Sequence, residues 1–232
     1  MTDQPLDTSR LPQLATRSDT IVASVEWLFE PAWRGDRLLA RVTDGAAQLT
    51  DRLGAAVDDE HREAREVIGP SVAAEQAVLD GVWTAQPFVG DGSAARHWAE
   101  TLAEEGLAGE VPDPVANETR RAFVVFDLVE LDGELLHEVP YQERRRLLSS
   151  VVEENVRVRI SPAVRLPIDS WLLAWRANGF THYVAKHMNS RYHPGEVTED
   201  WIEISAAHEH GPSIFGRMFG QRPKRRRFIG DR

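Results

Sequence analysis

Short apolar runs alternate with charged and turn-rich segments along most of the chain. The run at residues 123–126 is continuously apolar, which predicts a strand buried on both faces. Residues 156–160 alternate strictly between apolar and charged positions, which predicts a strand with one solvated face. Strands are predicted on this basis at residues 21–25, 38–42, 77–83, 123–128, 156–160, 182–186 and 201–204.

Helical patterns lie between these runs, at residues 58–67, 93–105, 141–154 and 169–178. The third pattern follows Pro140, which suits the first turn of a helix, and the last ends at Asn178 and Gly179, a favourable C-terminal cap. Strands and helices interleave without the regular period of a parallel doubly wound sheet. The pattern therefore predicts an α+β fold with mixed or antiparallel sheets and flanking helices.

One folded domain is predicted over residues 20–216, since a chain of 232 residues can bury one hydrophobic core. Residues 1–19 are polar and turn-rich and predict a loose N-terminal arm. The chain has neither a long apolar run nor the residue order of a signal peptide, so we expect no membrane contact and a cytoplasmic location. The absence of cysteine excludes disulfides, thiolate nucleophiles and cysteine-ligated metals.

Charge divides the chain into two parts. The formal net charge is -10, but residues 217–232 carry seven basic residues and one acidic residue, a net charge of +6. The remaining 20 basic and 36 acidic residues leave a net charge of -16 on residues 1–216, which repels a phosphate backbone. We therefore expect a basic C-terminal tail at residues 217–232 that binds nucleic acid or an acidic protein surface through electrostatic contact alone.

Five stretches carry a family resemblance, in the order and at the spacing that the family shows. They are residues 29–40 (FEPAWRGDRLLA), residues 79–82 (LDGV), residues 126–133 (FDLVELDG) with the following Leu136, Pro140 and 143–145, residues 184–186 (VAK) with 190–195 (SRYHPG), and residues 201–205 (WIEIS). Together they resemble the adenylation domain of ATP-dependent DNA ligases of the bacterial repair type. The resemblance implies an ATP-grasp-like nucleotidyltransferase fold, and the oligonucleotide-binding barrel that follows this domain in the family is not found.

The resemblance also implies a reaction, in which a lysine attacks the α-phosphate of ATP and holds AMP as a phosphoramidate, assisted by metal-binding carboxylates and phosphate-binding lysines. Here the nucleophile position is Ala32, whose methyl group cannot form that bond. Five other positions depart from the family's reactive or charged groups: Arg34, Val82, Thr181, Glu203 and Ser205. We therefore expect no catalytic residue and a degenerate member of the family.

Four retained residues would contact a nucleotide, ATP or AMP, if the family's roles carry over. Glu30 would face the adenine amine, Phe126 would stack on the base, Arg37 would reach ribose or phosphate, and Lys186 would reach the α-phosphate. Each has a plainer alternative. Lys186 could be a solvated charge at a strand end, Phe126 a core residue, and Arg37 a salt-bridge partner of Glu30, Asp36 or Asp127.

No metal site is expected, and a role for magnesium is left open. Asp80, Asp127 and Asp132 could be imagined as magnesium ligands, but turn and hydrogen-bonding roles fit their positions better. The histidines at 182, 187, 193, 208 and 210 match no zinc-ligand spacing.

Three functions stay open from the sequence. The first is a catalytically degenerate ligase-like protein, linked to DNA repair, that binds a nucleotide or a partner. The second is an active ligase or nucleotidyltransferase that uses Lys186, one of only two lysines in the chain. The third is a protein–protein interaction module that binds no nucleotide.

Overall fold

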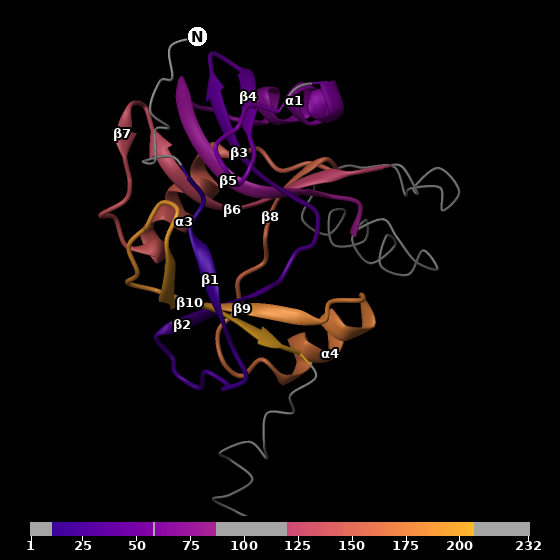
Figure 1. Cartoon of the computed structure of the whole chain (residues 1–232), viewed down its shortest axis with the longest axis vertical. Coiled ribbons are helices and arrows are strands. Elements are labelled where there is room, and N and C mark those ends of the chain that lie inside the picture. The colour runs from indigo at the N-terminus through magenta and orange to yellow at the C-terminus, as the bar shows by residue number, and fades with distance from the viewer. Residues whose placement is uncertain (1–10, 58, 87–119, 207–232) are drawn as a thin grey trace, which may run out of the picture.

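Two sheets form the frame of the computed structural model, which describes residues 11–57, 59–86 and 120–206 (Figure 1). A four-stranded sheet has the order β1-β10-β9-β2, and a six-stranded sheet has the order β4-β3-β5-β6-β7 with β8 paired to β6. The elements are β1 (Leu14–Ser18), β2 (Trp27–Pro31), β3 (Asp36–Thr43), β4 (Ala46–Thr50), the 3-10 turns η2 (Asp59–His61) and η3 (Gly69–Ser71), α1 (Arg62–Ile68), β5 (Gln76–Thr84), β6 (Ala122–Leu131), β7 (Glu134–Leu135), α3 (Tyr141–Val151), β8 (Val158–Ile160), α4 (Asp169–Ala177), β9 (His182–His187) and β10 (Val197–Ser205).

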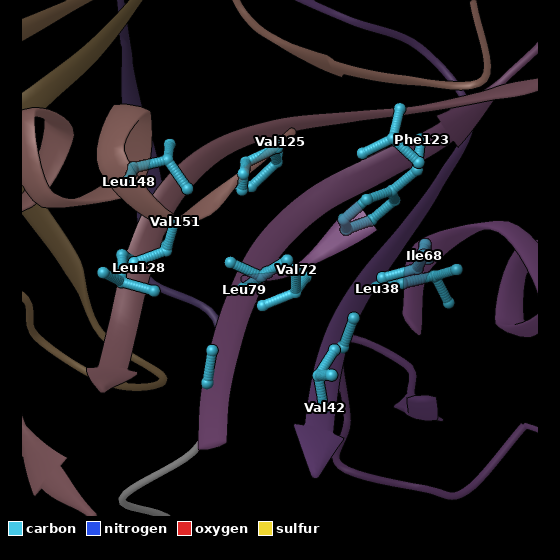
Figure 2. Close-up of a cluster of buried hydrophobic side chains, with 14 of the residues drawn as sticks. Leu38, Val42, Ile68, Val72, Leu79, Phe123, Val125, Leu128, Leu148 and Val151 are labelled. Atoms are coloured by element: carbon cyan, nitrogen blue, oxygen red, sulfur yellow. The ribbon is translucent and has the colours of Figure 1, made fainter. Parts of the chain in front are cut away.

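The six-stranded sheet buries one face against α1 and α3. Its central strands β3, β5 and β6 pair antiparallel, and the apolar residues of β3 alternate between its two faces. Leu38 and Leu79 from the sheet pack with Ile68 of α1 and Leu148 of α3 in one core cluster (Figure 2). The largely apolar sequence of β6 follows from this position, because nine of its ten residues are buried, Asp127 and Glu130 among them.

The four-stranded sheet packs its own outer face against α4, which lies beside β9 in the lower part of Figure 1. Leu172 and Trp175 of α4 contact the cluster that contains Phe29 of β2 and Tyr183 of β9. A third cluster joins the inner faces of the two sheets, with Phe126 and Trp201 among its members. The molecule is therefore layered as helices, sheet, sheet and helix, and the inner faces of the sheets face each other.

The predicted fold class is confirmed, but two predictions near the N-terminus are wrong. No strand forms at residues 21–25, and the strand lies instead at β2, where Phe29 and Glu30 pair with β9. The expected loose arm at residues 1–19 contains β1, which runs parallel to β10. Both errors have one cause: these strands are specified by a partner about 150 to 190 residues away in the chain, as Phe29 opposite Ala185 and Leu14 opposite Val197 show.

Other differences concern short or peripheral elements. Strands β4 and β7 were not expected, the strand predicted at 156–160 covers only Val158–Ile160, and α3 ends at Val151. The helix predicted at residues 93–105 and the basic tail at residues 217–232 lie outside the described residues. No helix in the described part of the chain is long and apolar enough to cross a membrane.

Candidate functional site: a pocket between the two sheets

A pocket of about 340 Å³ opens between the inner faces of the two sheets. The four-stranded sheet contributes Glu30, Ala32, Lys186, Trp201 and Glu203, among others. The six-stranded sheet contributes Arg37 of β3, Val82 of β5 and Phe126 of β6. The size suits a small organic ligand, because ligand pockets usually hold a few hundred cubic ångströms.

The strand register arranges the pocket residues of the four-stranded sheet in rows. Lys186 is opposite Leu28 on one side and Trp201 on the other, and Val184 is opposite Glu30 and Glu203. In the next row His182 is opposite Ser205, and its carbonyl accepts a 3.0 Å hydrogen bond from the Ala32 amide. Side chains two residues apart share a face, so His182 lies on the same face as Val184 and Lys186.

Lys186 is enclosed rather than solvated. Its side chain is 3% exposed, and its Nζ lies 3.3 Å from Glu30 Oε1. The same nitrogen lies 4.1 Å from the ring centre of Trp201, 4.3 Å from that of Phe126 and 4.9 Å from that of Tyr141. Burial lowers the pKa of the Lys186 ammonium below its usual value, and the Glu30 carboxylate opposes that shift.

Glu30 holds several partners at once. Its Oε1 accepts a short hydrogen bond from the Tyr141 hydroxyl and lies 3.5 Å from a guanidinium nitrogen of Arg145. Burial raises the pKa of the Tyr141 hydroxyl well above its usual value, and the neighbouring Glu30 carboxylate acts in the same direction. The carboxylate that the resemblance directs toward adenine is thus already engaged by groups of this chain.

Arg37 forms a two-pronged ion pair with Asp80. Its Nε and one terminal nitrogen lie 2.6 and 2.7 Å from the two carboxylate oxygens of Asp80, which is fully buried. The Tyr192 hydroxyl donates a further 2.7 Å hydrogen bond to Asp80, and the Arg37 guanidinium carbon lies 4.4 Å from the centre of the Phe126 ring. A phosphate bound by Arg37 would compete with this carboxylate.

Three of the positions at which the chain departs from the resembled motifs line the pocket, namely Ala32, Val82 and Glu203, whereas Arg34, Thr181 and Ser205 do not. Arg34 donates a short hydrogen bond to Thr181 Oγ1, and its backbone amide donates a 2.9 Å hydrogen bond to Gln86 Oε1. Thr181 Oγ1 also lies 2.9 Å from His182 Nδ1. Glu203 lies 3.4 Å from Arg17 of β1, a largely exposed ion pair.

Trp33 and Trp201 supply further aromatic surface and one polar group. Trp33 packs edge-on against Phe180, and its indole nitrogen donates a 3.0 Å hydrogen bond to Ser161. Trp201 is buried, and its indole N–H has no hydrogen-bond partner among the described residues. A buried donor without a partner costs free energy, so an acceptor atom on a bound ligand would stabilise this arrangement.

The described residues do not offer a site for a divalent metal ion, because no three His, Asp or Glu side chains among them converge. Asp127 is fully buried and pairs through both oxygens with Arg144 of α3, at 2.8 Å for each contact. Asp132 occupies a turn with a positive φ and accepts a hydrogen bond from the Gln76 amide. Asp80, as described above, holds Arg37.

The four residues predicted to meet a nucleotide therefore come together in one pocket. Glu30, Arg37, Phe126 and Lys186 all line it. The alternative of a solvated Lys186 is wrong, and the salt-bridge partner of Arg37 is Asp80 rather than Glu30, Asp36 or Asp127. Phe126 is both a core residue and a pocket wall. Sequence reasoning missed Tyr141 and Arg145, although their place on the helix after Pro140 could have indicated a face directed at the sheet.

The fold and the site define an α+β domain with a pocket of small-molecule size between two facing sheets. Comparison with known proteins narrows this class: a model of the ATP-dependent DNA ligase domain matches residues 12–204. The chain belongs to the ATP-dependent DNA ligase domain family.

Similar proteins agree with this assignment. The chain is 31% identical over 195 residues to the multifunctional non-homologous end joining DNA repair protein LigD of Mycobacterium tuberculosis, covering 83% of this chain and 23% of that protein. The solved ligase domain of M. tuberculosis LigD gives a TM-score of 0.63 at 26% identity, covering 85% of this chain and 59% of that one. A mycobacterial DNA ligase D structure complexed with ATP and MES gives the same TM-score at 26% identity, over 86% of this chain and 61% of that one. The chain thus spans about a quarter of the length of the LigD proteins.

Proposed function

We propose that this chain is a catalytically degenerate DNA ligase domain that binds a nucleotide, or a protein partner, in DNA repair without forming a covalent adenylate. The observation that carries the proposal is the methyl group of Ala32 at the position of the nucleophilic lysine. The similarity of the chain to the DNA repair protein LigD supports a role in DNA repair. The cytoplasmic location and the basic tail as a contact for nucleic acid or an acidic partner stay predictions.

The pocket supports binding of a flat heterocycle. Trp33, Phe126 and Trp201 line it with aromatic surface, and Glu30 lines it with a buried carboxylate whose Oε1 already contacts Tyr141, Arg145 and Lys186. In an active ligase, ATP provides the adenylyl group that the lysine accepts. Here the residues fit the nucleoside part of ATP or AMP, but no described group of carboxylates fits magnesium.

The alternative of an active enzyme that uses Lys186 finds little support in the geometry. The Lys186 amine is enclosed by three aromatic rings and paired with Glu30, whereas attack on a phosphorus atom requires an open in-line approach. Its lowered pKa increases the neutral fraction of the amine, but an attacking nitrogen must also reach the α-phosphate.

Intact-mass analysis after incubation with ATP and magnesium or manganese tests the proposal. We expect no mass increase of an adenylyl group and no sealing of nicked DNA, under conditions in which an active ligase shows both. A stable adduct would overturn the proposal. Loss of that adduct in Lys186→Ala, but not in Lys224→Ala, would assign the nucleophile to Lys186.

The third candidate is an interaction module that binds no nucleotide. Thermal-shift and calorimetric titrations with ATP and AMP distinguish it from a nucleotide-binding protein. Nucleotide binding raises the midpoint of thermal unfolding by mass action, and a module that binds only protein shows neither a shift nor heat.

A further inference from the structure

The N-terminal strand β1 forms one wall of the pocket. Leu14, Ala15 and Arg17 of this strand line it, and Figure 1 shows β1 between the strands of the two sheets. The strand lies at the edge of the four-stranded sheet, and β10 is its one neighbour among the described strands of that sheet. Access to the pocket on this side therefore depends on how firmly β1 is held.

The pairing of β1 with β10 is interrupted in its middle. The first part ends at Ala15, which is opposite Thr198. The second part begins at Thr16, which is opposite Ile202, so residues 199–201 of β10 have no pairing partner on β1. Two short ladders hold a strand less firmly than one continuous ladder, because neither contributes many hydrogen bonds.

Gln13, immediately before β1, is held far more firmly. It is fully buried, and each of its four polar atoms has a partner. Its Oε1 accepts a 2.9 Å hydrogen bond from the His193 amide, and its Nε2 donates a 2.8 Å hydrogen bond to the Thr198 hydroxyl. Its amide donates a 3.1 Å hydrogen bond to the Tyr192 hydroxyl, and its carbonyl accepts a 3.2 Å hydrogen bond from Arg37. These contacts join the start of β1 to both sheets, since Thr198 belongs to β10 and Arg37 to β3.

The backbone contacts of Gln13 are part of a closed ring of hydrogen bonds. Tyr192 and Arg37, which contact its amide and its carbonyl, both also bind the buried carboxylate of Asp80. Buried hydrogen bonds of this kind are costly to leave unmade. At the other end of β1, the ion pair of Arg17 contributes little, because that side chain is 87% exposed. The attachment of β1 is therefore concentrated at Gln13.

We propose that Gln13 and β1 form a strap over the pocket, which opens as a unit while the two sheets stay folded, and that Gln13 is the latch that keeps it closed. Opening of the strap uncovers the pocket between the sheets. This inference goes beyond the proposed function, because it concerns access to the pocket for whatever molecule enters it.

Thiol labelling of the full chain tests the strap, because the chain contains no cysteine and an introduced thiol is the only one that reacts. Val82 lines the pocket on β5 and is 5% exposed, so the thiol of Val82→Cys reports access to the pocket. Gln13→Ala removes two buried hydrogen bonds, and we expect it to raise the labelling rate of Val82→Cys about tenfold or more. Gln48→Ala, which changes an exposed glutamine of β4, should leave that rate unchanged.

A second thiol distinguishes opening of the strap from unfolding of the domain. Val125→Cys lies in the fully buried core on the other face of the six-stranded sheet, outside the pocket lining. Val82→Cys should label faster than Val125→Cys and with a weaker dependence on urea, because opening of the strap exposes little surface. Equal rates with equal urea dependence would mean that the pocket opens only when the domain unfolds. An unchanged rate in Gln13→Ala would mean that the pocket is accessible without the strap, and either result would overturn the inference.

Hydrogen exchange of the unsubstituted chain, followed by nuclear magnetic resonance, tests the same motion without relying on the folding of Gln13→Ala. The Leu14 amide donates a 2.9 Å hydrogen bond to the Glu196 carbonyl. It should exchange at least about tenfold faster than the amides of β9, a strand that is paired on both sides. Equal protection of the Leu14 amide and the β9 amides would contradict the strap.

Discussion

The two ends of the pocket differ in what they keep of the family and in how they are packed. The inner end, formed by Glu30, Phe126 and Lys186, keeps the motif residues and is buried, and Tyr141 packs against it. The second group, called the mouth, consists of Ala32 and Glu203, which line the pocket, and of Arg34 and Thr181, which contact each other outside its lining. All four depart from the motifs and are exposed or half-buried. Buried motif residues and replaced, more exposed positions therefore lie close together.

Physical chemistry explains this contrast without invoking catalysis. A buried ion pair that loses one member leaves an uncompensated charge in a low-dielectric interior, which strongly destabilises the fold. Exposed charges near solvent change with little cost. Loss of either Glu30 or Lys186 alone would therefore destabilise the fold, so their presence does not by itself indicate an active ligase.

Removal of Glu30 should show the largest effect. Glu30→Ala leaves the Lys186 ammonium buried next to Arg145 without its carboxylate, so we expect a loss of about 3–5 kcal/mol in the free energy of unfolding. Urea denaturation followed by circular dichroism measures it. Arg34→Ala at the mouth is the matched control and should change the same quantity by less than about 0.5 kcal/mol. Equal losses of unfolding free energy in Glu30→Ala and Arg34→Ala would contradict the proposed difference between the buried and the exposed positions.

The second-largest effect is expected at alkaline pH, which should lower the free energy of unfolding. Burial raises the pKa of all three tyrosines, well above the usual value for Tyr141 and Tyr192 and to about 12 for Tyr183. The folded state therefore keeps protons that the unfolded state loses near pH 10. The stabilisation is complete below about pH 10 and is lost as the pH rises through the folded-state values.

Tyrosinate absorbance and circular dichroism, recorded together during an alkaline titration, measure this effect. The two signals should change in one transition, because ionisation accompanies unfolding. A tyrosine that ionises near pH 10 while the dichroism stays native would contradict the buried hydroxyls described at the inner end.

A small effect is expected for the ion pair at the mouth. Arg17 is 87% exposed in its side chain and lies 3.4 Å from Glu203, so Arg17→Ala should cost less than about 1 kcal/mol of unfolding free energy, and less in high salt. Thermal unfolding at two salt concentrations checks this. A loss that is large and insensitive to salt would show that β1 depends on this pair.

Restoration of the amine alone should have no detectable effect on chemistry. Ala32→Lys places a lysine at the nucleophile position, but Arg34 and Thr181 still lack the family's carboxylates, so we expect no adenylate in the intact mass. An adenylate adduct from this single change would show that Ala32 alone accounts for the missing activity, and that the other replaced positions do not contribute to it.

Local patterns predicted much of this molecule. Strands β3, β5, β6 and β9 and helix α4 lie where apolar runs and helix-ending residues placed them, because these segments carry their own periodicity. The motifs also predicted that Glu30, Arg37, Phe126 and Lys186 share one site, since motif order along the chain reflects a shared fold.

Pairing across long separations was decided only by the tertiary structure. Strand β1 exists because Leu14 pairs with β10, and the environment of Lys186 depends on Glu30, Tyr141 and Trp201 from three different elements. The same holds for Arg37, whose partner Asp80 lies on the neighbouring strand β5. The sequence by itself determined which groups can carry charge, but burial and the distances between partners set which charges are neutralised, because both arise only when the two sheets close on each other.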